Sequence, residues 1–172
     1  MPRLRNTAVP GTRVSGGSLE GVLCVYSLSK QSNLAGYRAA FVAGDPSLVA
    51  ELVAVRKQAG MMLPGPVQAA FRAALADDAA PAAQREVYRA RRAQLAPALE
   101  SAGGTIHGSQ AGLYLWTTFD EDSMATVDRL ADLGVLVAPG MFYGEGGARF
   151  VRVALTATDE RIAAAAQRLE RS

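Results

Sequence analysis

Short apolar runs alternate with amphipathic segments along this chain, and the alternation predicts an α/β protein. The first part of the pattern predicts a buried strand at 22–26, a loop at 27–37, a second strand at 39–44 and a helix from the Asp45-Pro46 cap to about Ala59. Both strands are nearly continuous in apolar residues, as is typical of strands covered on both faces. We therefore expect this part to belong to a larger sheet that the chain does not complete.

A different order of elements follows the break at 60–66. The pattern predicts helices at 67–76 and 82–101, strands at 112–117, 135–138 and 149–154, and helices at 123–133 and from Asp159 onward. This order predicts four segments: an irregular stretch at 1–17, a partial large domain at 18–80, a connecting helix at 81–103 and a small α+β domain at 104–172.

Composition narrows the class of protein. The chain has 172 residues, of which 49% are hydrophobic, so it can bury a core of ordinary size. No apolar run reaches the roughly 18 to 20 residues of a membrane helix, and the N-terminus lacks the apolar block of a signal peptide. We expect a cytoplasmic protein that does not bind membranes. Its net charge of +2 comes from arginines interleaved with acids, which argues against a nucleic-acid-binding face.

Two potentially reactive side chains are interpreted as structural. Cys24 is the one cysteine and lies inside the first apolar run, so we expect it in the core. His107 is the one histidine and has no cysteine, histidine or acid at metal-ligand spacing, so it is expected to be structural or exposed. The sequence predicts no metal site.

The loop at 27–37 carries the candidate chemistry. Lys30 is one of two lysines among 18 basic residues, and Ser27, Ser29 and Arg38 lie close to it in the sequence. A lysine that can bind an aldehyde, together with hydroxyls and a guanidinium that can bind a phosphate, suits pyridoxal 5'-phosphate. The alternative is that Lys30 is a solvated loop residue and Arg38 a cation at the edge of a strand.

Residues 27–40 resemble the lysine attachment motif of the class I/II aminotransferases. The resemblance implies the C-terminal portion of the fold-type I pyridoxal-phosphate-dependent transferases, with the end of the large-domain sheet and the small α+β domain. It also implies that Lys30 binds the cofactor and moves the proton during transfer, and that Ser27, Ser29 and Arg38 bind its phosphate. Substrates would be an amino acid and a 2-oxo acid, and the complete protein would be a homodimer.

A second constellation contains two arginines near the C-terminus. Arg149 and Arg152 are three residues apart, so on a strand they point to opposite faces. The segment is similar to the C-terminal region of the same family, and the resemblance implies that Arg152 binds the substrate carboxylate. The alternative is a salt bridge between Arg152 and a helix acid. The runs 112–116 and 139–144 resemble the small-domain strand and the loop at the edge of the substrate site.

The resemblance covers about residues 18–170 and corresponds to the C-terminal half of a family member. Residues 1–26 contain no aspartate, whereas the family places the acid that binds the ring nitrogen upstream of its lysine. We therefore expect a truncated or wrongly started product that is marginally stable alone.

Within the family, the runs 27–38, 41–45 and 61–68 look most like the actinobacterial succinyldiaminopimelate aminotransferases of lysine biosynthesis. Spacing and charge do not select that substrate over another amino acid. Three alternatives stay open: a non-catalytic remnant or interaction module, the sensing domain of a transcription regulator, and a related lysine-dependent reaction such as β-elimination.

Overall fold

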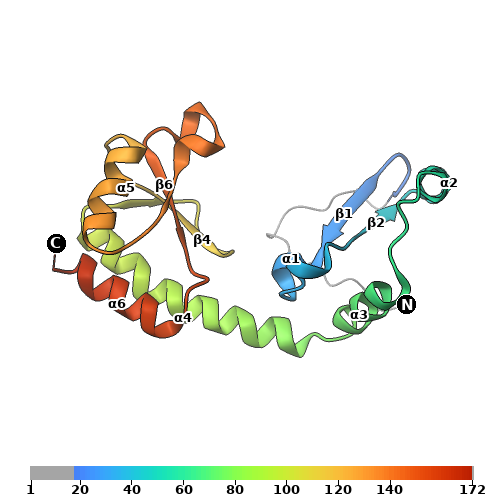
Figure 1. Cartoon of the computed structure of the whole chain (residues 1–172), viewed down its shortest axis with the longest axis horizontal. Helices are drawn as coiled ribbons and strands as arrows, with labels where there is room; N and C mark the ends of the chain where they lie inside the picture. Colours follow the sequence, from blue (N-terminus) through green and yellow to red (C-terminus); the bar gives the residue numbers. More distant parts are fainter. Residues whose placement is uncertain (1–17, 172) are drawn as a thin grey trace. The chain divides into compact units, whose positions relative to one another are not determined.

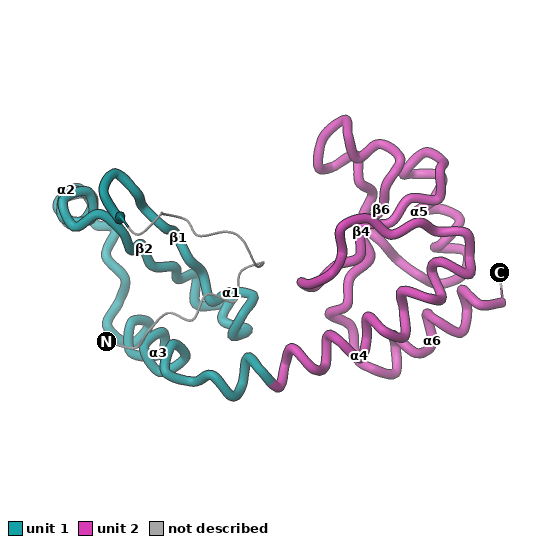
Figure 2. Tube along the Cα trace, turned by 180° about the vertical axis from the view of Figure 1, so that it is seen from behind, with its two compact units in different colours: residues 1–82 teal, residues 83–172 magenta. Residues whose placement is uncertain are grey.

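The structure is a computed structural model that describes residues 18–171, so the predicted irregular stretch at 1–17 lies outside the described residues. The chain divides into two compact units, residues 1–82 and 83–172 (Figure 2). The long helix α4 (Ala79–Ser101) begins in the first unit and continues in the second. Each unit is described by itself.

The first unit contains a two-stranded antiparallel sheet and short helices (Figure 1). Its elements are β1 (Leu23–Ser27), α1 (Leu28–Gln31), the 3-10 helix η1 (Ala35–Tyr37), β2 (Ala40–Gly44), α2 (Pro46–Gln58) and α3 (Gly65–Leu75). Leu28, Ala39 and Phe71 are buried together and form its small core. Leu28 directly follows β1 and Ala39 directly precedes β2, so this core fixes the end of the hairpin that carries α1.

The predicted cap of α2 is present. The Asp45 side chain accepts a hydrogen bond from the backbone N–H of Ser47 and another from that of Gly21, both at 2.8 Å. The bond from Gly21, followed by the hydroxyl of Ser47, lowers the pKa of Asp45 to about 2. This carboxylate joins the turn before β1 to the start of α2.

Three expectations for the first unit are wrong. All five residues of β1 are exposed, and Cys24 with them, because β2 is the only strand that pairs with β1 in the described chain. The helices pack partly against β2, for example through Phe41 and Phe71, and leave the apolar side chains of β1 in water. The span 27–37 is not an irregular loop, because it forms α1 and η1.

The second unit is a four-stranded antiparallel sheet with helices on one face. Its elements after α4 are β3 (Thr105–His107), β4 (Tyr114–Thr118), α5 (Ser123–Asp132), β5 (Ala138–Pro139), the 3-10 helices η2 (Gly140–Tyr143) and η3 (Glu145–Gly147), β6 (Phe150–Ala154) and α6 (Asp159–Leu169). The strand order is β3-β4-β6-β5. The sequence pattern did not predict β3.

Buried and partly buried residues alternate along β4 and β6, so the sheet has two different faces. Leu115, Val151 and Val153 are buried against apolar side chains of α4, α5 and α6, and these residues form the main core. Figures 1 and 2 both show α6 running beside the C-terminal part of α4. Tyr114, Trp116, Phe150 and Arg152 point to the opposite face and are only partly buried. The helices thus cover one face and leave an aromatic face available.

Candidate active site

Lys30 lies on α1, the four-residue helix that directly follows β1. Ser27 caps this helix, because its Oγ accepts a hydrogen bond from the backbone N–H of Ser29 at 3.1 Å. Leu28 is fully buried and attaches the helix to the small core. The cap and the buried leucine set the position of α1, and the Lys30 side chain is exposed on it.

Two hydroxyls lie beside the start of α1. Ser27 Oγ is 2.8 Å from Ser29 Oγ and 3.2 Å from the carbonyl oxygen of Ala39. The second contact follows from the strand register, which places Ser27 opposite Ala40. The fold therefore brings both hydroxyls next to the backbone that immediately follows Arg38.

Arg38 occupies a left-handed backbone conformation, with φ 50° and ψ 42°. This conformation costs an L-residue other than glycine on the order of 1 kcal/mol, so the surrounding structure must hold it. It ends η1 immediately before Ala39 and β2. Arg38 Nη1 donates to the carbonyl oxygen of Ala35 at 3.1 Å, and the rest of the side chain is exposed.

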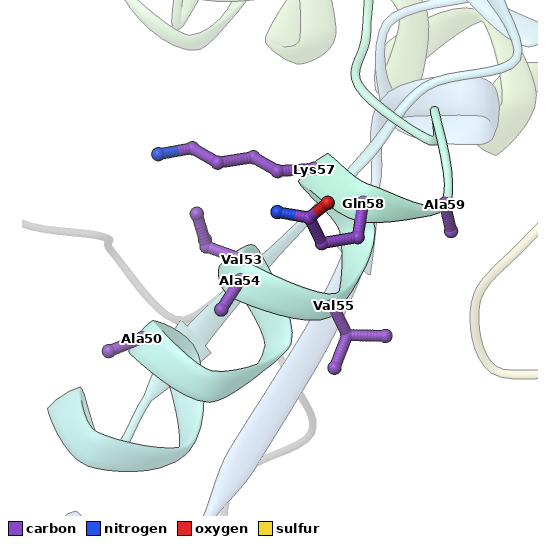
Figure 3. A pocket seen from close by; sticks show the side chains of 7 residues that line it. All are labelled: Ala50, Val53, Ala54, Val55, Lys57, Gln58 and Ala59. Carbon is purple, nitrogen blue, oxygen red and sulfur yellow. The ribbon is translucent and has the colours of Figure 1, made fainter.

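Lys57 has different surroundings. It lies on α2 in a shallow groove along one side of the helix (Figure 3), which is lined by Ala50, Val53, Ala54, Val55, Gln58 and Ala59. None of these side chains carries a hydroxyl or a guanidinium. Of the two lysines, Lys30 is the one with the serine hydroxyls of its own helix start beside it.

Arg152 lies on the aromatic face of the second unit. Its guanidinium carbon is 4.2 Å from the centre of the Tyr114 ring and 5.4 Å from that of Tyr143. Arg152 Nε is buried, and within residues 18–171 the side chain has no hydrogen bond or ion pair. The salt bridge expected as an alternative is therefore absent from the described chain.

Arg149 serves a different purpose. It precedes β6 and forms an ion pair of 2.8 Å with Asp120. The two arginines are thus distinguished by their contacts, because Arg149 has an acid partner and Arg152 has aromatic rings.

The aromatic face is a connected group of rings. Trp116 stacks on Phe150 with centroids 5.2 Å apart and 6° between the ring planes, and it meets the Tyr143 ring edge-on at 5.7 Å. His107 packs edge-on against Phe150 at 5.2 Å. The sequence identified the segments that carry these rings but not their contacts with Arg152, which depend on the pairing of β4 with β6.

The loop that carries Tyr143 is fixed at its two ends. A Cβ on Gly140 would lie 2.3 Å from the Gly147 carbonyl oxygen, and one on Gly147 would lie 2.1 Å from that of Gly140. Only two residues without side chains can approach this closely. The glycine pair therefore holds η2 and η3 against the start of β6.

Metal binding has no support among the described residues. Within 18–171 there is no group of three or more histidine, cysteine or acidic side chains that could hold a metal ion. No helix in this range combines the length and the apolar character needed to cross a membrane.

Comparison with known proteins decides the family. The sequence pattern of the family Aminotransferase class I and II matches residues 8–169. The chain belongs to this family. It is 56% identical over 165 residues to the 4-dedimethylamino-4-oxo-anhydrotetracycline transaminase OxyQ of Streptomyces rimosus, covering 96% of this chain and 46% of that protein.

Two further relatives agree. The chain is 62% identical over 156 residues to the probable aminotransferase Rv1178 of Mycobacterium tuberculosis, covering 91% of this chain and 37% of that protein. The fold matches the structure of a probable N-succinyldiaminopimelate aminotransferase of Thermus thermophilus with a TM-score of 0.76 and 31% identity, covering 91% of this chain and 43% of that one. The chain therefore spans less than half the length of these aminotransferases, and its fold is a part of theirs.

Class I and II aminotransferases are enzymes that depend on pyridoxal phosphate. The residues of the first unit suit this cofactor chemically. They combine an exposed amine, two hydroxyls 2.8 Å apart and a guanidinium that, among the described residues, donates only to a backbone carbonyl. This donor set can bind both an aldehyde and a phosphate.

Proposed function

We propose that this chain supplies the lysine, the phosphate ligands and the carboxylate-binding arginine of an enzyme that transfers an amino group between an amino acid and a 2-oxo acid. The family match over residues 8–169 is the observation that supports this most strongly. The surroundings of Lys30 and Arg152 agree with it, because among the described residues the exposed Lys30 side chain has no hydrogen-bond partner and Arg152 has no acid partner.

Each side chain has a separate task. Lys30 Nζ would hold the cofactor through its aldehyde group and would take up the proton that the substrate Cα loses. Ser27, Ser29 and Arg38 bind the phosphate, and Arg152 binds the substrate carboxylate as a planar fork. The bound cofactor supplies a ring that withdraws electrons from the substrate.

We also propose the domain limits 18–80, 81–103 and 104–172, and a homodimer for the complete protein. These limits agree roughly with the division at residue 82, although they separate the long helix as a connector.

The proposed substrates are N-succinyl-diaminopimelate and glutamate. The runs around Lys30 and at 61–68 support this choice, and so does the name of the Thermus thermophilus relative. The name of the Streptomyces rimosus relative supports a different substrate, 4-dedimethylamino-4-oxo-anhydrotetracycline. Comparing amino transfer from glutamate to the 2-oxo acid that corresponds to N-succinyl-diaminopimelate and to 4-dedimethylamino-4-oxo-anhydrotetracycline, in the complete protein, would decide between them.

A second candidate function is a non-catalytic interaction module. The exposed β1 supports it, because Val25 is 70% exposed and, among the described residues, its strand is paired along only one of its two edges. Failure of the chain to bind pyridoxal phosphate would favour this alternative.

Borohydride reduction tests the central assignment. The purified chain is mixed with pyridoxal phosphate, reduced and digested, and the labelled lysine is located by mass spectrometry. We expect the label on Lys30, loss of that label in Lys30→Ala and full labelling in the control Lys57→Ala. Equal labelling of both lysines, or labelling of Lys57 alone, would contradict the proposal.

A further inference from the structure

Arg152 differs from the other partly buried arginines of its unit. Arg91, Arg92 and Arg129 each donate to a protein oxygen, namely Asp159 Oδ1 at 2.6 Å, the Gly112 carbonyl at 2.6 Å and Glu121 Oε1 at 2.8 Å. Arg152 is buried to a similar degree but has no acceptor among the described residues. Its Nε is buried without a partner, which is costly, and its terminal N–H groups have no acceptor among the described residues.

The contacts that Arg152 does have are with rings. Tyr114 lies two residues before Trp116 on β4, and Trp116 is the residue directly opposite Arg152 in the strand pairing. Tyr143 reaches the same guanidinium from η2 and is itself held by its edge-on contact with Trp116. A ring attracts a cation through its face without using any of the N–H groups.

We infer that Tyr114 and Tyr143 are positioning residues, which hold the Arg152 guanidinium by their ring faces and leave its N–H groups for a carboxylate. This inference rests on the proposed role of Arg152. A lysine or glutamate beside Arg152 would compete for the carboxylate or pair with the arginine, whereas a ring does neither. The two tyrosines therefore restrict the side chain and preserve its charge for the substrate.

The protein contains a built-in reporter for this site. Trp116 is the only tryptophan in the sequence, and it lies opposite Arg152 and 5.7 Å from the Tyr143 ring. Binding of a carboxylate at Arg152 should change the fluorescence of Trp116, which is excited at a wavelength that tyrosine does not absorb. This measurement needs neither cofactor nor turnover.

The experiment titrates the full chain with glutarate at constant ionic strength, with uncharged glutaramide as the matched probe. We expect glutarate alone to change the Trp116 signal, and Arg152→Gln to abolish the change. Tyr114→Leu and Tyr143→Leu should each raise the apparent Kd about five-fold, the loss expected for one ring. Tyr114→Phe and Tyr143→Phe should bind as the parent chain does, because they keep the ring.

Two controls separate this effect from general damage. Arg149→Gln removes a neighbouring charge that already has an acid partner, and Tyr88→Leu removes a ring that lies 5.8 Å from Arg91. Both should leave glutarate binding unchanged. Circular dichroism checks that each variant folds, and if Tyr114→Leu does not, the 53% exposed Tyr143 decides the question.

The outcomes distinguish the inference from the proposed function. The role of the rings is overturned if the folded leucine variants of Tyr114 and Tyr143 bind glutarate as tightly as the parent chain. It is also overturned if the phenylalanine and leucine variants lose affinity equally. In both cases the proposed role of Arg152 is unaffected. Undiminished binding in Arg152→Gln, or no binding of glutarate by the parent chain, overturns the assignment of Arg152 as well.

Discussion

Replacing Gly140 with alanine should destabilise the second unit, because the added methyl group has no room. The new Cβ would lie 2.3 Å from the Gly147 carbonyl oxygen, 2.5 Å from the Phe150 carbonyl oxygen and 2.9 Å from Trp116 Cη2. Two of these three atoms belong to the backbone, so relief requires the 140–147 loop to move away from β6. A turn of a side chain is not enough.

The expected loss of unfolding free energy follows from the number and kind of atoms that the new methyl group would meet. Forcing one extra methyl group into a packed site costs about 1–3 kcal/mol, and backbone neighbours place Gly140→Ala in the upper part of that range. A loss of about 2.5 kcal/mol lowers the Tm of a domain of this size by about 15 °C. Since the loop carries Tyr143, the variant should also lose part of the near-ultraviolet signal of Trp116.

Gly146→Ala is the matched control. It lies in the same loop, is exposed, and would place its Cβ with no atom within 4 Å. Thermal and urea unfolding of both variants, followed through Trp116, report on the second unit. If Gly140→Ala unfolds at the same temperature as Gly146→Ala, the close approach of residues 140 and 147 is not a real constraint and the argument fails.

Further predictions concern the pH dependence and the core of the second unit. Arg129 donates to Glu121 and so holds the pKa of Glu121 below its ordinary value of 4.5. A lowered carboxyl pKa stabilises the fold above the unfolded value and loses that contribution as the pH falls through the folded value. The Trp116-monitored stability of the parent chain should therefore fall more steeply below about pH 4.5 than that of Glu121→Gln, and parallel curves would contradict this role. Leu130→Ala should cost about 3 kcal/mol in urea unfolding, because Leu130 is fully buried in the main core, whereas the 86% exposed Leu136 should tolerate alanine within about 0.5 kcal/mol.

The sequence predicted the elements that are specified by neighbouring residues, such as a capped helix or an alternating strand. Asp45-Pro46 marked the start of α2, and the carboxylate does cap that helix. The alternating residues of β4 and β6 predicted strands, and one face of each is indeed buried. Strand β3 has only three residues and no comparable pattern, which is why the sequence did not reveal it.

Burial in the first unit could not be predicted from its apolar runs. A run such as 22–26 indicates a strand that can be covered, but the covering layers come from other parts of a fold. In the described chain β1 pairs with β2 alone, so Val25 and Cys24 are exposed. The apolar composition of β1 therefore indicates that the strand can be buried. It does not indicate whether the strand is buried in the described chain.

The predicted site residues fall into two groups that depend on different kinds of information. Lys30, Ser27, Ser29 and Arg38 are neighbours in sequence, so a motif was sufficient to group them. The pairing of Ser27 with the Ala39 carbonyl additionally required the β1–β2 register. Their roles stay predictions until the labelled lysine is identified.

The two arginines show most clearly what a fold adds. Their spacing predicted opposite faces, but it did not indicate which guanidinium has a partner. Asp120 neutralises Arg149 across 2.8 Å, and Tyr114 and Tyr143 contact Arg152 without neutralising it. A carboxylate therefore meets a guanidinium with an acid partner at Arg149 and one without an acid partner among the described residues at Arg152, where the buried Nε leaves the terminal N–H groups to donate. The difference arises from the side chains that the sheet places around each arginine. These contacts favour Arg152 over Arg149 as the residue proposed to bind a carboxylate, and this argument does not depend on the resemblance to a family.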